Sequence, residues 1–189
     1  EKIMSIHDRS LYLTYAEALS HPGDFSSNAA SFIAQDADIN VVHPFNQLTG
    51  TDAYLNEFLL PLQHSFEGLY RRDDIFMVGE FEGQNWISSM GYYVGQFTRD
   101  WIGLSATKTL CYLRYGEFHH IQNGQAVESY IYLDIPELMI ACNQWPLDMG
   151  PGYSRGYTGL IQGPASRDGV LIEAADPAEG QLSYQIVTD

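Results

Sequence analysis

The chain has 189 residues, and its 9 Lys and Arg against 24 Asp and Glu give a formal net charge of -15. This charge repels phosphate backbones and anionic lipid surfaces, which argues against nucleic acid as a partner. No stretch approaches the roughly 18 apolar residues of a membrane span, and no signal peptide is recognisable, so we expect a cytoplasmic protein with no membrane partner.

The aromatic content is unusually high, with 13 Tyr, 9 Phe and 3 Trp. It predicts an aromatic core or a cavity lined by aromatic rings, and composition alone does not separate the two. Cys111 and Cys142 have neither metal-ligand nor redox-pair spacing, so we expect both to be buried, reduced thiols.

The N-terminal part is predicted to be mainly helical. Apolar residues recur with helical spacing over residues 8–20 and again after Asp24, which predicts two short helices. Residues 37–43 are β-prone, and a third helix is expected to follow Gly50. Pro61 should kink that helix or end it early.

From Arg72 onward the period changes from 3.6 to 2, which predicts strands up to residue 133 with Gly83 in a turn. Helices first and strands afterwards favour an α+β fold with an antiparallel sheet. Gly91 and Gly95 alternate with Tyr93 on one strand face, where their missing side chains leave room for a helix or a ligand.

The C-terminal part differs in composition. We expect residues 1–148 to form one α+β domain and residues 149–189, rich in Gly and Pro, to form an extension. The last residues, AEGQLSYQIVTD, are typical of the start of a helix, which is compatible with an extension that leads to a further domain.

The most informative segment runs from Arg114 to Met139, where two aromatic, β-branched runs meet at Asn123-Gly124. A three-residue loop over residues 122–124 would pair Glu117 with Ser129. One face of this hairpin would then be largely apolar and carry Cys111, Leu113, Tyr115, Glu117, His119, Val127, Ser129, Ile131 and Leu133. A two-residue turn would shift the partners on the second strand but leave the facing of Glu117 unchanged.

Glu117 is the leading candidate for chemistry. A carboxylate on an apolar concave wall loses water, which raises its pKa toward neutrality and suits it to acid/base work. The alternative is an exposed carboxylate, or one paired with Arg114 or Lys108. His119 is the second candidate, although a core histidine with a structural hydrogen bond is the commoner case.

Other polar and aromatic positions have simpler explanations. Asp134 with Glu137 spells a helix capping box. His43 either faces a cavity mouth or fixes the turn before Pro44. Trp86 and Trp101 are bulky enough to line a pocket, but most such side chains are core. Since no phosphate loop, nucleophile elbow or paired metal ligands occur, we expect neither cofactor nor metal.

Several blocks resemble the SnoaL-type polyketide cyclase family of the nuclear transport factor 2-like, or ketosteroid isomerase-like, group. They are HPF at 43–45, DWIGLSAT at 100–107, RYGEF at 114–118 and LDIPELM at 133–139. The resemblance covers about residues 5–147. It implies a conical, strongly curved antiparallel sheet wrapped around the N-terminal helices, a cystatin-like α+β roll with a deep pocket, and frequently a homodimer through the sheet.

The family's chemistry transfers only in part. Its cyclases close a polyketide ring by an aldol step without metal or cofactor, using an Asp on the last long strand and a His on the neighbouring strand. Alignment on the Asn123-Gly124 turn places that Asp at Ile131 and that His at Glu117. Ile131 cannot move a proton, so the ring-closing activity does not follow from the resemblance.

Two functions from different classes remain. In the first, a neutral Glu117 with His119 moves a proton next to a carbonyl of an apolar small molecule, in a pocket lined by residues such as Tyr115, Tyr93, Trp86, His43, Ile131 and Trp101. The second is a non-catalytic domain that binds an apolar ligand or dimerises. A third function, epoxide-type hydrolysis, would need an Asp-Arg-Asp set. The sequence offers only Arg114 and Asp134 for this set, and both lie on the wrong face of the hairpin.

Overall fold

The computed structural model describes residues 6–19, 25–148, 150, 160–163, 165, 170 and 177–188. The helices are α1 (Ile6–Ala18), α2 (Phe25–Phe32), α3 (Gly50–Ala53), the π-helix η1 (Tyr54–Leu59), α4 (Leu60–Ser65), α5 (Ile135–Ala141) and α6 (Pro177–Thr188). The strands are β1 (Ile33–Val41), β2 (Asn46–Thr49), β3 (Phe66–Phe81), β4 (Gln84–Phe97), β5 (Leu110–Gln122) and β6 (Gln125–Leu133).

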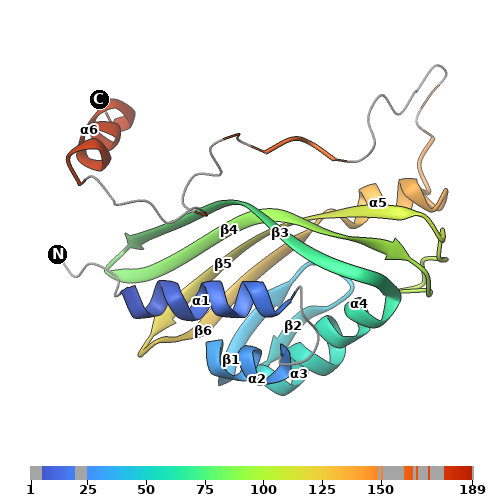
Figure 1. Ribbon diagram of the computed structural model, residues 1–189, viewed down its shortest axis with the longest axis horizontal. Coiled ribbons are helices and arrows are strands. Elements are labelled where there is room, and N and C mark those ends of the chain that lie inside the picture. Colours follow the sequence, from blue (N-terminus) through green and yellow to red (C-terminus); the bar gives the residue numbers. More distant parts are fainter. Residues whose placement is uncertain are drawn as a thin grey trace.

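The strands form one six-stranded sheet in the order β2-β1-β6-β5-β4-β3. Neighbouring strands are antiparallel except β1 and β6, which run parallel. The sheet curves strongly, and helices α1 to α4 lie against its concave side (Figure 1). The expected α+β fold with a curved sheet around N-terminal helices is confirmed.

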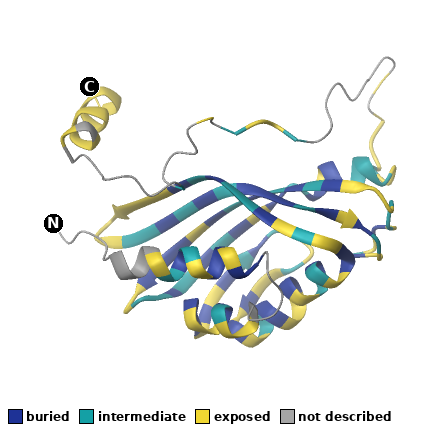
Figure 2. Cartoon of the chain, in the orientation of Figure 1, coloured by how far each residue is buried: buried dark blue, intermediate teal, exposed yellow. Residues whose placement is uncertain are grey.

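We call the helix-covered side of the sheet the inner face and the opposite side the outer face. Buried residues concentrate between the inner face and the helices (Figure 2). Along β5, odd-numbered residues such as Leu113 and Tyr115 are buried, whereas Phe118 is 44% exposed on the outer face. The core therefore occupies the space between the helices and the inner face.

Pro61 was expected to kink the helix after Gly50 or to end it early. Helix α3 continues through η1 and α4 up to Ser65, so the early end is wrong, and the irregularity before Pro61 is a π turn. Proline has no N–H to donate, and its ring crowds the carbonyl four residues earlier. The widened π turn comes directly before it, and there Leu60 N–H donates to Leu55 O, five residues back. Pro61 thus lies in the first turn of α4, directly after the π turn.

The hairpin of β5 and β6 differs from the expected register. Gln122 pairs with Gln125 across a two-residue turn, in which Asn123 and Gly124 both have positive φ. A bulge then shifts the pairing, so that Glu117 pairs with Ile131 instead of Ser129. The predicted partners of Glu117 were wrong by two residues, and this even shift leaves Ser129 and Ile131 on the predicted face. Ala126 differs, because it pairs with Ile121 before the bulge and is buried.

Gly91 and Gly95 make room for strand β3, and not for a helix or a ligand. A Cβ on Gly91 would lie 1.9 Å from the carbonyl oxygen of Arg72, and one on Gly95 would lie 3.2 Å from Leu69 Cα. A register shift in β3 between Asp73 and Ile75 accompanies this close backbone approach.

The C-terminal segment has two described features. The expected terminal helix is present as α6, and Ile161 N–H donates to Tyr92 Oη at 2.9 Å on the outer face. The division into a domain and an extension stays a prediction. Among the described helices, none is long and apolar enough to cross a membrane.

The N-cap of α5 provides a stability prediction. Asp134 accepts a hydrogen bond from Glu137 N–H at 3.1 Å, which confirms the predicted cap. Asp134→Ala should lower the free energy of unfolding by about 1 kcal/mol in urea denaturation. Asp134→Asn, which can still cap, is the matched control, and equal losses in both variants would contradict the cap as the cause.

Gly91 provides a second stability prediction. Gly91→Ala should lower the free energy of unfolding by about 1–3 kcal/mol, because the backbone of β3 must move away from the new methyl group. Gly116 on β5 has no heavy atom within 4 Å of its would-be Cβ. Gly116→Ala should therefore change stability by less than about 1 kcal/mol. Urea denaturation of both variants tests the difference, and similar stability would rule out the close approach.

Candidate active site

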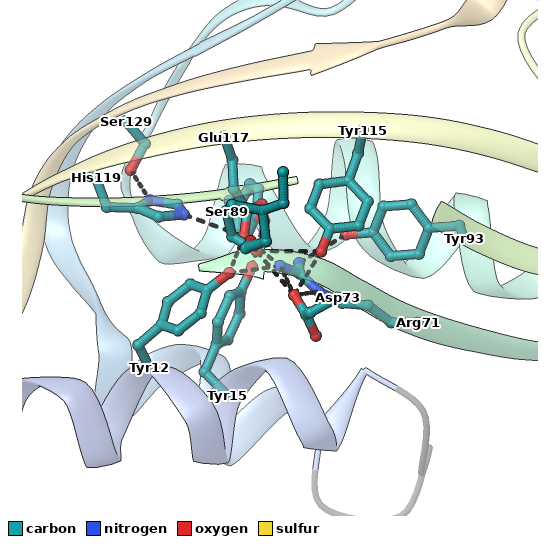
Figure 3. A network of polar contacts seen from close by, with 12 residues as sticks. Tyr12, Tyr15, Arg71, Asp73, Ser89, Tyr93, Tyr115, Glu117, His119 and Ser129 are labelled. Atoms are coloured by element: carbon teal, nitrogen blue, oxygen red, sulfur yellow. Dashed lines mark hydrogen bonds and ion pairs between the residues drawn. The ribbon is translucent and has the colours of Figure 1, made fainter. Parts of the chain in front are cut away.

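A buried polar network lies on the inner face beneath α1 (Figure 3). Four strands and one helix contribute to it. Its described members include Tyr12 and Tyr15 from α1, Arg71 and Asp73 from β3, Ser89 and Tyr93 from β4, Tyr115, Glu117 and His119 from β5, and Ser129 from β6.

Glu117 is the central acceptor of the network. It is 1% exposed, so the predicted inward facing is confirmed. Its Oε1 accepts hydrogen bonds from Arg71 Nη2 at 2.5 Å and from Tyr12 Oη at 2.8 Å. The charged partner of Glu117 is therefore Arg71 from β3. Arg114 and Lys108, which the sequence suggested as partners, do not pair with it.

The expected neutral tendency of Glu117 is wrong. Burial alone would raise the pKa of this carboxyl, but the Arg71 cation and His119 hold it well below its usual range. A charged partner in direct contact outweighs desolvation here because the ion pair forms in a medium with little water to screen it. Glu117 is thus a carboxylate at neutral pH.

Arg71 is fully buried and links the two acidic residues. Besides Glu117, it donates from Nη2 to Asp73 Oδ1 at 3.0 Å, and its guanidinium carbon lies 4.2 Å from the ring centroid of Tyr115. Burial opposes its charge, but Asp73 and Glu117 more than compensate and raise the pKa of Arg71 well above its ordinary value. The arginine remains a cation.

One phenol and one hydroxyl also donate to Asp73. Ser89 Oγ donates to its Oδ1 at 2.9 Å, and Tyr115 Oη donates to the same oxygen. Burial raises the pKa of Tyr115, and likewise that of Tyr12, well above the ordinary value. These phenols therefore stay protonated and act as donors.

His119 connects the network to β6. It is fully buried, its Nδ1 lies 2.8 Å from Ser129 Oγ, and its Nε2 lies 3.5 Å from Glu117 Oε1. The second distance is too long for a good hydrogen bond. The described residues provide no hydrogen-bond partner for His119 Nε2 or Glu117 Oε2, although both atoms are buried.

Only some of the predicted pocket residues come together. Tyr93 and Tyr115 belong to the network, since Arg71 Nη1 donates to Tyr93 Oη at 3.2 Å, and Ile131 is buried beside Glu117 in the sheet register. The other three predicted pocket residues, Trp86, Trp101 and His43, lie elsewhere, which corrects the predicted pocket.

Trp86 lies on the outer face, stacked on His120 at 5.2 Å, so it cannot line a space with Glu117. Trp101 packs against Phe45 and Phe66, and His43 is exposed.

Sequence reasoning missed Arg71, Asp73 and Tyr12. The signal for the first two is the run Arg71-Arg72-Asp73-Asp74, because residues two apart in a strand share a face. One ion pair then lies on each face: Arg71 with Asp73 inside, and Arg72 with Asp74 at 2.8 Å outside. The statement that only Arg114 and Asp134 could form an acid-arginine-acid set is wrong, since Asp73, Arg71 and Glu117 form one.

This arrangement combines a fixed carboxylate, a fixed cation and several neutral donors around one imidazole. Two acceptor or donor positions, Glu117 Oε2 and His119 Nε2, are available to a further hydrogen-bonding atom. Such a group can orient a hydroxyl or water and can accept a proton on the imidazole. The described residues contain no cluster of three or more potential metal ligands.

Comparison with solved structures identifies the fold. No family model matches the chain, and no curated protein matches it. A protein from Jannaschia sp. CCS1, named as a candidate SnoaL-like polyketide cyclase, superimposes with a TM-score of 0.64 and 12% identity, over 78% of this chain and 98% of that one.

Two further structures agree. A candidate polyketide cyclase from Xanthomonas campestris gives a TM-score of 0.57 with 20% identity, over 72% of this chain and 96% of that one. A nuclear transport factor 2-like protein of unknown function from Burkholderia pseudomallei gives 0.56 with 16% identity, over 72% and 97%. The chain therefore has the fold of the SnoaL-like polyketide cyclases and other nuclear transport factor 2-like proteins.

Proposed function

We propose that this chain is a cofactor-independent enzyme that moves a proton next to the carbonyl group of an apolar small molecule. His119 is the proton acceptor, and Glu117 is the carboxylate that stabilises it. The observation that carries this proposal is the pair of buried atoms, His119 Nε2 and Glu117 Oε2, that lack a hydrogen-bond partner among the described residues. Buried polar atoms without partners are rare and need an explanation.

The two residues have unequal roles because Arg71 holds Glu117 in its ionised form. A carboxylate with a lowered pKa is a weak base, but it favours a positive charge on a neighbouring imidazole. If His119 Nδ1 carries its proton and donates to Ser129, then Nε2 presents a lone pair. Nε2 takes a proton from the carbon beside the carbonyl, and the electron pair moves to the carbonyl oxygen.

The surroundings suit an apolar ligand with one polar end. The rings of Phe32 and Phe76 lie 5.5 and 5.0 Å from that of Tyr12, and Phe32 also packs edge-on to His119 at 5.2 Å. The phenols of Tyr12 and Tyr115 would donate to the enolate oxygen only after turning their single protons away from Glu117 and Asp73. Since α1 covers the network (Figure 3), a ligand must displace side chains of this helix to reach it.

A second candidate is supported by Arg71, which bridges Asp73 and Glu117. In this function the free oxygen of Glu117 orients a water molecule that attacks an epoxide or another strained electrophile. The non-catalytic alternative, a domain that only binds the ligand, is supported by the lowered pKa of Glu117. Proton exchange on a ketone separates the first function from the other two.

The test uses 2-tetralone, a fused-ring ketone, with its α-proton exchange in D2O followed by NMR. The wild-type chain should accelerate exchange over buffer, and His119→Gln should lower the catalysed rate by about 100-fold or more, because the acceptor nitrogen is lost. Glu117→Gln should lose most of the exchange, because the imidazolium is no longer stabilised. It should also lower the free energy of unfolding, because Arg71 loses one of its two carboxylate partners, so its exchange is compared at a temperature where circular dichroism shows the variant folded.

His120→Gln is the matched control, since His120 is the next residue and stacks on Trp86 at the outer face. It should leave exchange unchanged. Exchange in His119→Gln equal to that of the wild type would discard the assignment of the base. If the wild-type chain binds 2-tetralone but does not catalyse exchange, the non-catalytic binding function remains. If it opens styrene oxide but does not exchange protons on 2-tetralone, the hydrolytic function is favoured.

A further inference from the structure

A broad apolar groove lies on the outer face, opposite the buried network. It has a volume of about 640 Å³, and its lining includes Met77, Phe81, Trp86, Phe118, Tyr130 and Tyr132. Four of these side chains are strongly exposed: Met77 by 57%, Phe81 by 65%, Phe118 by 44% and Tyr132 by 54%. Contiguous exposed aromatic surface of this kind marks an interaction site.

Among the described residues, helix α6 also exposes apolar side chains. All its described side chains are exposed, and the apolar ones include Leu182 at 57%, Tyr184 at 65%, Ile186 at 71% and Val187 at 84%. A helix of 12 residues is marginal in water without tertiary packing. It therefore needs a surface that covers these side chains.

The chain leading to α6 is attached to the same side of the sheet as the groove. Ile161 N–H donates to Tyr92 Oη, and Gly163 packs so closely against Asp74 that a Cβ there would lie 2.6 Å from the carboxyl carbon. Tyr92 follows Trp86 on the outer face of β4 by an even number of residues. The segment is thus anchored a few residues from the groove.

We propose that α6 docks into the outer groove of a second copy of this chain, and that the second copy returns its own α6. In the structure α6 lies beyond the tips of β3 and β4, apart from its own sheet (Figure 1). Each copy offers one helix and one groove, so a two-fold exchange would cover both.

The chemistry of the two surfaces suits this contact. The charged residue in the described lining of the groove is Glu80, and the residues of α6 from Gln181 to Thr188 carry no charge. Two copies with a net charge of -15 each repel one another, so the contact must be driven by apolar burial. Raised salt should accordingly strengthen the dimer by screening the repulsion.

The first experiment measures mass by light scattering after gel filtration. The wild-type chain should be a dimer, and Ile186→Glu and Phe118→Glu should each raise the dimer dissociation constant at least tenfold. Tyr70→Glu is the matched control, since Tyr70 is a 48% exposed aromatic residue on β3 outside the groove lining. A monomeric wild type, or a dimer insensitive to both groove and helix substitutions, would overturn the proposal.

The second experiment identifies which copy supplies the helix. Chains carrying Phe118→Cys and chains carrying Ile186→Cys, both with Cys142→Ser, are mixed and treated with a short bismaleimide. A cross-linked heterodimer supports the exchange. A third sample is a single chain that carries both Phe118→Cys and Ile186→Cys. If only this chain is cross-linked, and within itself, α6 covers its own groove. If neither sample is cross-linked, docking of α6 in the groove is excluded. Circular dichroism confirms that each variant is folded.

Discussion

The ion pair between Arg71 and Glu117 is the interaction on which the interior of this protein depends. Both side chains are essentially out of contact with water, so either charge alone would cost several kcal/mol. Asp73 and Tyr12 share the same guanidinium, and the pair therefore ties α1 to β3 and β5 at one point. An apolar core would be simpler to build, which is why we attribute this network to function.

The parts of the fold that the sequence predicts are those set by local patterns. The alternation of apolar residues in β5 was enough to place Glu117 on the inner face, because facing depends on one strand alone. The cap at Asp134 and the turn at Asn123-Gly124 follow from short motifs with a known backbone geometry. These features needed no knowledge of which strands are neighbours.

The parts that were missed depend on pairing between strands. Alternation puts Arg71 and Asp73 on one face of β3, but register shifts lie on both sides of them, so the rest of the strand does not tell which face that is. The partner of Glu117 on β6 was displaced by the bulge after the turn. With Arg71 unrecognised as its partner, burial was expected to dominate the pKa of Glu117, and this is why the expected direction was wrong.

Strand β5 places two different surfaces back to back. Glu117 and His119 point into the buried network, while Phe118 and His120 point to the outer face, where Phe118 lines the groove. Alternation allows one strand to serve an inner site and an outer contact with no shared side chain. If both proposals hold, the two faces are coupled, because a contact that fixes the backbone of β5 from outside would restrain the imidazole and the carboxylate on its inner side. A helix docked over Phe118 would thus hold the two side chains of the proposed site in place without touching either.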